Sequence, residues 1–565
     1  MTLPDTAHSS RPKSLGGRGG QRPPHGSERA SDAKPLLQAR DLAVTIAARP
    51  VLHGISFDLA PGEILALTGE SGSGKSMTAL AVMGLLPDHA RATGSLTIGD
   101  GENLLALSEK TLCTLRGREM GMIFQEPMTA LNPVQTIGRQ VSETIRIHKA
   151  LPAQEAEARA AETLARVGLP PDRVPPTRYP HELSGGQRQR VGIAMAIALR
   201  PRLLIADEPT TALDVTTQAQ ILDLLKGLVA EEGMSLLMIT HDLAVVSDMA
   251  DRIAVMNKGE IVEEAPTAQL FREMRHPYTR TLFEASQHRA DLPPEQPRTE
   301  PLLKVEGARR AYALPRTRPF AARPTFEALK GVDLTLHRGE RLGLVGESGC
   351  GKSTLTRAIL GLEPLQGGTI TAFGQEVSPD MPAATRAGLQ VVFQDPYGSF
   401  NPRHRVRRLI TEPLHLLSDP PQGRARDEAV AEALTAVGLS PDDADRHIHA
   451  FSGGQRQRIA IARALILRPE VILFDEAVSA LDVRVRAQIL DLIADLSRDY
   501  GLAWLFISHD LTVVRSITDR VLVMQEGRIV EEGPTAQVLE APTHPYTRKL
   551  VAAAPRLPEI GQAST

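Results

Sequence analysis

The chain has 565 residues, and its 64 Lys and Arg residues nearly balance its 67 Asp and Glu residues, which gives a formal net charge of −3. This length exceeds what one hydrophobic core normally serves, so we expect two or more domains. The charge balance argues against a dedicated nucleic-acid-binding protein, which usually has a basic surplus. Two cysteines, Cys113 and Cys350, are too few for a disulfide framework or a cysteine metal site, and they fit a reducing cytoplasmic setting.

The N-terminal segment is rich in Gly, Ser and Pro and lacks the apolar stretch of a signal peptide. We expect residues 1–34 to form a disordered tail, with weak attraction to an anionic membrane surface as the alternative. No segment of the sequence approaches the ~18–20 consecutive apolar residues that a bilayer-spanning helix needs. If the protein acts at a membrane, other chains must supply the membrane spans.

The sequence is an internal duplication. Four pairs of residues share one spacing of 268 positions: Ser184 and Ser452, Glu208 and Glu476, His241 and His509, and His276 and His544. This repeat predicts two copies of one domain, at 35–287 and 302–557, joined by a Pro-rich linker at 288–301 and followed by a tail at 558–565. In both copies short apolar runs alternate with helical stretches, which predicts an α/β domain around a largely parallel sheet.

A glycine-rich segment lies between an apolar run and a helical pattern in each copy. The segments are Gly69-Glu70-Ser71-Gly72-Ser73-Gly74-Lys75-Ser76 and Gly346-Glu347-Ser348-Gly349-Cys350-Gly351-Lys352-Ser353, the second followed by Thr354. Both fit G-x-x-x-x-G-K-S, a phosphate-binding loop (P-loop) whose backbone N–H groups surround phosphates. We expect Lys75 and Lys352 to neutralise the β- and γ-phosphate oxygens, and Ser76 and Ser353 to ligate Mg²⁺.

An Asp-Glu pair follows a later apolar run in each copy, as Asp207-Glu208 and Asp475-Glu476. The aspartates are suited to binding Mg²⁺, and the glutamates can polarise an attacking water molecule. An acid pair after a strand is unspecific by itself. Together with the P-loops it predicts a nucleoside triphosphatase.

A second glycine motif distinguishes the kind of nucleoside triphosphatase. It reads Leu183-Ser184-Gly185-Gly186-Gln187 in copy one and Phe451-Ser452-Gly453-Gly454-Gln455 in copy two. A serine and two glycines at a helix start expose several N–H groups, which makes a second anion site. Two domains that face head to tail need such a site, because each P-loop is then completed by the Ser-Gly-Gly of the other domain.

These motifs resemble those of the ATP-binding-cassette (ABC) ATPases, whose signature is Leu-Ser-Gly-Gly-Gln. The resemblance implies two tandem P-loop NTPase domains, each with a RecA-like α/β core, an antiparallel β part and a helical signature subdomain. It identifies Gln125 and Gln394 as the Q-loop glutamines, which contact Mg²⁺ and the γ-phosphate. The implied catalytic residues are Glu208, His241, Glu476 and His509, the histidines being those that stabilise the transferring phosphoryl group. Residues 212–214 and 480–482 resemble the D-loops.

Further segments narrow the resemblance to the importers of dipeptides, oligopeptides and nickel. These are the Q-loop segments at 123–133 and 392–402, and the motif His-Pro-Tyr-Thr at His276–Thr279 and His544–Thr547. The implied cofactors are ATP and Mg²⁺. The implied partners are two transmembrane permease subunits and, indirectly, a periplasmic or surface solute-binding protein, with no nucleic acid, at the cytoplasmic face of the bacterial inner membrane. Peptides are the expected cargo, and glutathione, nickel chelates and other small solutes stay open.

The sequence departs from this subfamily in three places. The cysteine cluster that many members carry after His-Pro-Tyr-Thr is missing, so we expect no iron–sulfur cluster. The adenine-stacking aromatic residue is Tyr312 in copy two, and its counterpart in copy one is Ile46, which offers only apolar contact. Ala477 follows Glu476 where copy one has Pro209. Both copies keep the Lys, Asp, Glu and His residues, so we expect both to hydrolyse ATP.

Two other classes of protein share the cassette motifs. Twin-cassette ATPases of translation or DNA maintenance typically have a long charged helical linker, whereas this linker is short and Pro-rich. An exporter ATPase fits poorly with the importer-like Q-loop segments. Cys350, inside the second P-loop, leads us to expect that a bulky thiol reagent blocks ATP there and that bound nucleotide protects it.

Overall fold

In the computed structural model, residues 34–126, 130–149, 151–211, 213–294, 300–314, 323–395 and 398–558 are described. Residues 1–33 of the expected tail at 1–34 and residues 559–565 of the expected tail at 558–565 lie outside this part of the chain, as do the middle of the linker at 295–299 and Ala212 of the first D-loop. Among the described helices, none has both the length and the apolar character needed to cross a bilayer. Both copies lie within one compact unit, Pro35–Thr565.

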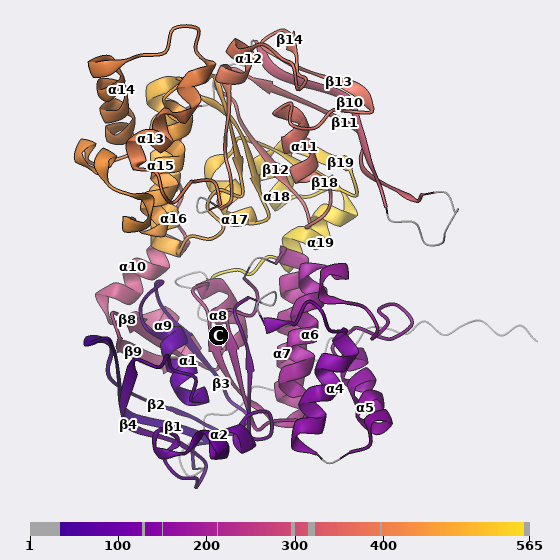
Figure 1. Ribbon diagram of the computed structural model, residues 1–565, viewed down its shortest axis with the longest axis vertical. Coiled ribbons are helices and arrows are strands. Elements are labelled where there is room, and N and C mark those ends of the chain that lie inside the picture. The colour runs from indigo at the N-terminus through magenta and orange to yellow at the C-terminus, as the bar shows by residue number, and fades with distance from the viewer. Residues whose placement is uncertain are drawn as a thin grey trace, which may run out of the picture. The chain divides into compact units, whose positions relative to one another are not determined.

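A six-stranded sheet forms the centre of copy one, in the order β5-β6-β7-β3-β8-β9 (Figure 1). Its strands are β3 (Ile64–Thr68), β5 (Met120–Ile123), β6 (Leu203–Asp207), β7 (Ser235–Ile239), β8 (Arg252–Asn257) and β9 (Glu260–Pro266). All neighbours are parallel except β8 and β9. The inner strands are continuous buried runs because helices cover both faces of a parallel sheet.

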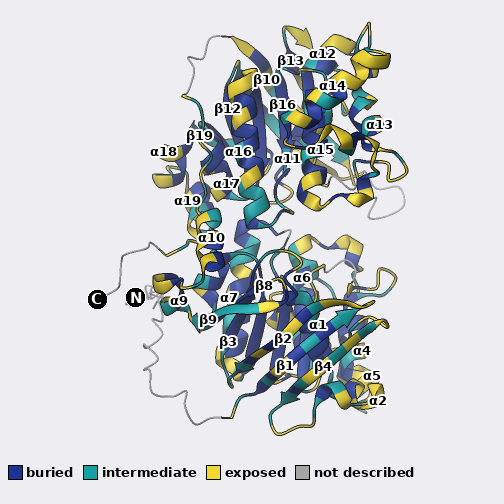
Figure 2. Cartoon of the chain, turned by 90° about the vertical axis from the view of Figure 1, so that its left-hand side faces the viewer, coloured by how far each residue is buried: buried dark blue, intermediate teal, exposed yellow. Residues whose placement is uncertain are grey.

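Copy two repeats this sheet in the order β15-β16-β17-β12-β18-β19. Its strands are β12 (Arg341–Val345), β15 (Leu389–Val392), β16 (Val471–Asp475), β17 (Ala503–Ser508), β18 (Arg520–Gln525) and β19 (Arg528–Pro534). In Figure 2 the inner strands of both sheets are buried, while the outer faces of the helices are exposed.

Each copy also has an antiparallel sheet. In copy one its order is β2-β1-β4, with β1 (Leu37–Ile46), β2 (Arg49–Leu59) and β4 (Ala90–Ile98). In copy two its order is β11-β10-β13-β14, with β10 (Pro301–Ala313), β11 (Thr325–His337), β13 (Gly367–Ala372) and β14 (Gln375–Glu376).

The helices of the two copies correspond closely. In copy one they are α1 (Lys75–Met83), α2 (Glu109–Leu115), α4 (Ile137–His148), α5 (Ala153–Arg166), α6 (Gly185–Ile197), α7 (Val215–Glu232), α8 (Leu243–Met249), α9 (Thr267–Glu273) and α10 (Pro277–Ser286), with 3₁₀ turns at Leu104–Ala106 and Pro180–Glu182. In copy two they are α11 (Lys352–Ile359), α12 (Ala383–Gly388), α13 (Val406–Thr411), α14 (Gly423–Ala436), α15 (Gly453–Leu465), α16 (Val483–Tyr500), α17 (Leu511–Ile517), α18 (Thr535–Glu540) and α19 (Pro545–Ala553), with 3₁₀ turns at Glu412–Leu416, Pro441–Asp445 and Ile448–Ala450.

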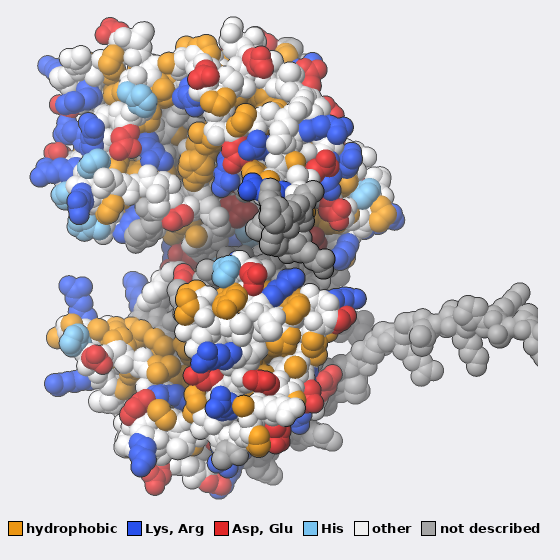
Figure 3. Space-filling model, turned by 45° about the vertical axis from the view of Figure 1, so that its right-hand side comes forward, with side chains coloured by type: hydrophobic (Ala, Val, Ile, Leu, Met, Phe, Trp, Pro, Cys, Tyr) orange, Lys and Arg blue, Asp and Glu red, His pale blue; other side chains and the backbone are white. Residues whose placement is uncertain are grey.

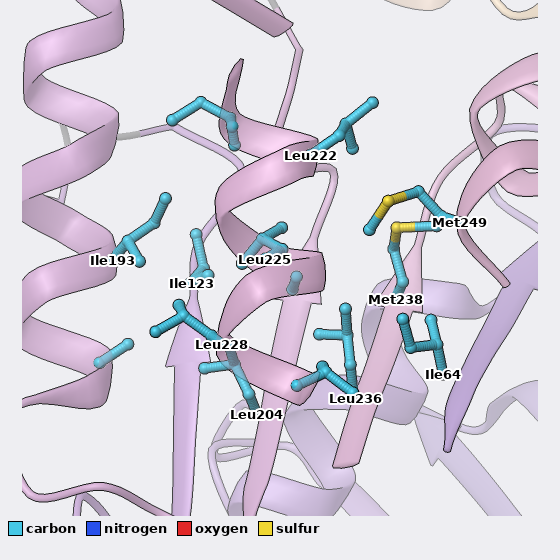
Figure 4. Close-up of a cluster of buried hydrophobic side chains, with 14 of the residues drawn as sticks. Ile64, Ile123, Ile193, Leu204, Leu222, Leu225, Leu228, Leu236, Met238 and Met249 are labelled. Atoms are coloured by element: carbon cyan, nitrogen blue, oxygen red, sulfur yellow. The ribbon is translucent and has the colours of Figure 1, made fainter. Parts of the chain in front are cut away.

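The core of copy one lies between the central sheet and the helices. Figure 4 shows Leu222, Leu225 and Leu228 on one face of α7, above the strand residues Leu204 and Leu236. Helices α4, α5 and α6 pack on one another at one side of this core (Figure 1). The predicted fold class is confirmed, because each copy has an α/β core with an antiparallel part.

Figure 3 shows both acidic and basic side chains on the face that it draws, with basic side chains more numerous at its upper left. The residues of the predicted nucleotide sites lie at one edge of each central sheet. Strands β3, β6 and β7 are parallel neighbours, so the residues that follow them meet at their carboxyl ends. The P-loop follows β3, the Asp-Glu pair stands at the end of β6, and His241 follows β7.

Candidate active sites

The P-loop of each copy makes a turn that only glycine permits. Gly69 has φ 152° and Gly346 has φ 158°, directly after the buried strands β3 and β12. A Cβ atom on Gly69 would lie 2.1 Å from the carbonyl oxygen of Met256, and one on Gly346 would lie 2.2 Å from that of Met524. The first residue of the P-loop is therefore a glycine because neighbouring backbone leaves no room for a side chain.

A buried lysine closes each loop. Lys75 Nζ donates to the carbonyl oxygens of Gly69 and Glu70, both at 2.8 Å. Lys352 Nζ makes the equivalent bonds, to Gly346 at 2.7 Å and to Glu347 at 3.0 Å. Burial lowers the pKa of Lys75. Each loop thus holds a positive charge at the first turn of a helix, where an anion is also favoured by the helix dipole.

The aspartate of each acid pair lies beside the P-loop. Asp207 Oδ1 accepts a hydrogen bond from Ser76 Oγ at 3.1 Å, across 131 residues of sequence. Burial raises the pKa of Asp207 to about 6, and it also raises the pKa of Asp475 to about 6. An oxygen-only pair of a hydroxyl and a carboxylate matches the ligands that Mg²⁺ prefers. The predicted ligands Ser76 and Asp207 are therefore brought together.

The glutamate of each pair has unusual backbone geometry. Glu208 has φ 46° and Glu476 has φ 50°, in the left-handed region that non-glycine residues rarely occupy. Their N–H groups donate to the carbonyl oxygens of Ile239 and Ile507, both at 2.9 Å, which holds the turn in place. Backbone strain of this kind concentrates at functional sites. Nothing in the local sequence predicted it.

In copy one, the glutamate, the histidine and the glutamine form one cluster. Glu208 Oε1 is 3.1 Å from His241 Nδ1, and Glu208 Oε2 accepts from Gln125 Nε2 at 3.0 Å and from Thr211 Oγ1 at 2.8 Å. Burial acts to raise the pKa of Glu208, but the contacts with His241 and Thr211 outweigh it and lower the pKa to about 2. Glu208 is therefore ionised at any physiological pH.

Copy two arranges the same three residue types differently. Glu476 Oε1 is 3.4 Å from His509 Nδ1, whereas Gln394 Nε2 contacts Ser479 Oγ at 3.5 Å. Burial acts to raise the pKa of Glu476, but His509 lowers it. Burial acts to lower the pKa of His509, but Glu476 raises it. The glutamate and the histidine are thus paired in both copies, whereas the glutamine contacts the glutamate in copy one and a serine in copy two.

The Ser-Gly-Gly-Gln motif begins helices α6 and α15, as predicted. Ser184 Oγ accepts from the Gln187 N–H at 3.3 Å, while Gln187 Oε1 accepts from the Ser184 N–H at 3.1 Å, and Ser452 and Gln455 repeat this capping box. The second glycine of the motif is also required for steric reasons, because a Cβ atom on Gly186 would lie 2.3 Å from Thr217 Cγ2 on α7. That glycine allows α6 to approach the start of α7 closely.

Contacts between the copies reach both P-loops. Thr216 Oγ1 donates to Glu347 Oε1 at 2.6 Å, and Asp214 Oδ2 accepts from the Ser348 N–H at 3.4 Å. In the reverse direction, Arg484 donates to Glu70 Oε1 at 2.8 Å. Asp214 is the last residue of the first D-loop and caps α7, and Thr216 and Arg484 lie in the first turns of α7 and α16. No motif in the sequence pointed to Thr216 or Arg484. The two residues occupy the same position of the repeat, so the difference between the copies there was visible in the sequence.

The two residues that distinguish the copies have clear surroundings. Tyr312 lies on β10, donates its hydroxyl hydrogen to Glu363, and has the Arg310 guanidinium 5.1 Å from its ring centre. Ile46 ends β1, the corresponding strand, and is partly buried against the core. Cys350 is buried, and burial raises its pKa. A buried thiol with a raised pKa reacts slowly. The expected block of ATP binding by a bulky thiol reagent at Cys350 therefore stays a prediction.

A P-loop after a buried parallel strand, an acid pair at the end of a second strand of the same sheet and a histidine after the strand between them, together with a capped glycine motif on a separate helix, define an ATPase of the cassette class. The sequence profile of the ABC transporter family matches residues 52–211 and 329–479. The profile of the oligopeptide/dipeptide transporter C-terminal region matches 262–323 and 530–563. The chain belongs to the ABC transporter family: it is an ATP-binding, ATP-hydrolysing subunit with two tandem cassettes, each bearing the C-terminal region of the oligopeptide/dipeptide transporters.

Two curated relatives are similar over nearly their whole length. The chain is 47% identical over 537 residues to the peptidoglycan transport ATP-binding protein YejF of Agrobacterium fabrum, covering 93% of this chain and 97% of that protein. It is also 47% identical over 538 residues to the glutathione import ATP-binding protein GsiA of Escherichia coli K12, covering 89% of this chain and 86% of that protein.

Proposed function

We propose that the chain drives the import of peptides or peptide-like solutes. The observation that carries the proposal is the oligopeptide/dipeptide C-terminal region, which occurs in both cassettes. The names of the relatives support it, since one transports peptidoglycan and the other imports glutathione. Cargo recognition would belong to a periplasmic or surface solute-binding protein and to the permeases. Nickel chelates and other small solutes remain alternative cargoes.

We also propose that ATP is hydrolysed at two composite sites, each between one P-loop and the opposite signature. Site one comprises Lys75, Ser76, Gln125, Asp207, Glu208 and His241 with Ser452–Gln455; site two comprises Lys352, Ser353, Gln394, Asp475, Glu476 and His509 with Ser184–Gln187. The contacts of Thr216 and Arg484 with the opposite P-loops support this pairing of cassettes. The internal repeat supports the proposed domain boundaries, 35–287 and 302–557, with a linker at 288–301.

Within each site the residues would divide the work as follows. Lys75 and Lys352 neutralise the β- and γ-phosphates, and the P-loop N–H groups hold them. The oxygens of Ser76, Gln125 and Asp207, and of Ser353, Gln394 and Asp475, would hold Mg²⁺, which when bound offsets phosphate charge. Glu208 and Glu476 would accept a proton from the attacking water. His241 and His509, which contact these carboxylates, would stabilise the transferring phosphoryl group.

The protein would work with two transmembrane permease subunits at the cytoplasmic face of the bacterial inner membrane, without nucleic acid and without an iron–sulfur cluster. The test is affinity purification of the tagged chain from its native host. Two multi-span membrane proteins should come down with it, and vesicles containing the complex should take up peptide only with ATP. Recovery of ribosomes in place of membrane proteins would favour a twin-cassette translation factor and overturn the proposal.

A further inference from the structure

The His-Pro-Tyr-Thr motif is held firmly against the central sheet in both cassettes. His276 and His544 cap helices α10 and α19, and each accepts a hydrogen bond from the N–H of the following tyrosine at 3.2 Å. A glutamate on the last strand of each sheet fixes the segment before the helix. Glu263 accepts from the backbone N–H groups of Arg275 and His276, and Glu531 accepts from those of Thr543 and His544. The position of the tyrosine is therefore set by the fold.

The tyrosine of this motif reaches the P-loop of its own cassette. The Tyr278 hydroxyl oxygen accepts from the Glu70 N–H at 3.1 Å, and the Tyr546 hydroxyl oxygen accepts from the Glu347 N–H at 3.0 Å. The partners are 208 and 199 residues apart in sequence. The same contact occurs in both copies, so it does not depend on the residues that distinguish them.

The peptide group that the tyrosine contacts is also the one on which the lysine rests. The peptide between Gly69 and Glu70 donates its N–H to Tyr278, and its carbonyl oxygen accepts from Lys75 Nζ at 2.8 Å. The peptide between Gly346 and Glu347 is held by Tyr546 and Lys352 in the same way. Hydrogen bonds at both ends of a peptide group polarise it and strengthen each other. The tyrosine thus acts on the lysine through one peptide plane.

We propose that Tyr278 and Tyr546 are positioning residues of the two nucleotide sites, holding the P-loop peptide that sets the place of the phosphate-binding lysine. The C-terminal region of each cassette then contributes a positioning residue to the ATP site of that cassette. The inference rests on the proposed role of Lys75 and Lys352 in binding phosphate.

The hydroxyl group can be separated from the ring. The rings are almost fully buried and pack in the cores, Tyr278 with Leu282 and Phe283, and Tyr546 with Leu550. A phenylalanine keeps this packing and removes only the hydroxyl oxygen, which leaves the Glu70 or Glu347 N–H without its partner. Burial raises the pKa of Tyr278 to about 12 and raises the pKa of Tyr546 as well, so both hydroxyls stay neutral at working pH.

The test uses the full-length chain with one P-loop disabled, so that each site is measured alone. Tyr278→Phe is made in a Lys352→Ala background and Tyr546→Phe in a Lys75→Ala background, and binding of a fluorescent ATP analogue is titrated. We expect dissociation constants to rise by about five- to tenfold, at the low end of the effect of an unpaired buried donor. Tyr500→Phe, at the exposed end of α16, is the matched control and should change nothing.

A second measurement separates positioning from packing. In the otherwise wild-type chain, the KM for ATP should rise in Tyr278→Phe and Tyr546→Phe while kcat stays within about twofold and the melting temperature stays near that of the wild type. A lower melting temperature with unchanged KM and binding would reduce the tyrosines to packing residues and overturn the inference. Normal binding by the Lys75→Ala, Lys352→Ala double variant would instead contradict the proposed role of the lysines.

Discussion

The two cassettes agree where phosphate would bind and differ around it. Both have the same lysine, the same strained glutamate and the same tyrosine contact. What reaches the P-loop glutamate from the other cassette differs: Arg484 forms an ion pair with Glu70, whereas Thr216 donates a neutral hydroxyl to Glu347. The two copies have thus kept the same residues around the P-loop lysine and differ in the side chain that reaches the P-loop glutamate from the other copy.

The largest effect is expected from the strained glutamates. Glu208→Gln and Glu476→Gln should each abolish turnover at one site, and the double variant should lose about 10²–10⁴ in ATPase rate if each residue is a general base. Phosphate release by the purified chain measures this, and ATP binding should persist. The single variants show whether the two sites turn over equally. A double variant with the wild-type rate would refute the assignment.

The aspartates are a place where the cassettes should behave alike. Because the pKa values of Asp207 and Asp475 are raised to about 6, the stability they contribute is full below pH ~4 and is lost as pH rises through 6. Asp207→Asn and Asp475→Asn should therefore stabilise the nucleotide-free chain at pH 8, by on the order of 1–3 kcal/mol, and not at pH 4.

Urea unfolding at the two pH values measures this difference. The same variants should lose the extra stability that MgATP gives to the wild-type chain, because a carboxylate that could hold Mg²⁺ is gone. Destabilisation at pH 8 would show that the aspartates are ionised without cost in the folded chain.

The cysteines should differ in reactivity. Cys113 is exposed, whereas Cys350 is buried in the second P-loop with a raised pKa. A maleimide should therefore modify Cys113 at least about tenfold faster than Cys350. Mass spectrometry of a time course, with and without ATP, measures both rates, and nucleotide should slow only Cys350. Equal rates would mean that the second P-loop opens readily in solution.

The smallest effect is expected from the contact to the P-loop glutamate, which is an ion pair in copy one and a neutral hydrogen bond in copy two. Arg484→Thr should weaken nucleotide binding at site one by at most about fivefold, because the side chains of the ion pair are 41% and 27% exposed. The effect should vanish at ~1 M salt, where such pairs are screened. Thr216→Arg should make site two salt-sensitive in turn. Arg424→Thr, which removes an exposed pair on α14, is the control.

Much of each site was predictable because its motifs are local. The P-loop, the acid pair and the glycine motif each combine a strand end or a helix start with residues a few positions apart, so spacing alone placed Lys75, Asp207 and Ser184. Their meeting at one sheet edge followed from parallel strands. The pairing of Glu208 with His241 agrees with the order of the motifs.

The remaining features depend on contacts between distant segments. The Tyr278 hydroxyl meets Glu70 only after the whole cassette has folded, and the left-handed turn at Glu208 is imposed by a neighbouring strand. The need for glycine at Gly186 comes from Thr217 on another helix. A resemblance could flag His-Pro-Tyr-Thr as typical of a subfamily, but it could not say what the tyrosine contacts.

The hydroxyl contact redefines where a cassette ends. A fragment stopped after β9 at Pro266 would retain the P-loop, the acid pair, the glycine motif and the histidine, and would look complete by its motifs. It would lack the α10 tyrosine, so the peptide beneath Lys75 would lose its support. On the proposal above, the part of the first cassette that shapes its P-loop extends into α10, which ends at Ser286, and chimeras that exchange C-terminal regions between transporters would exchange part of the nucleotide site as well.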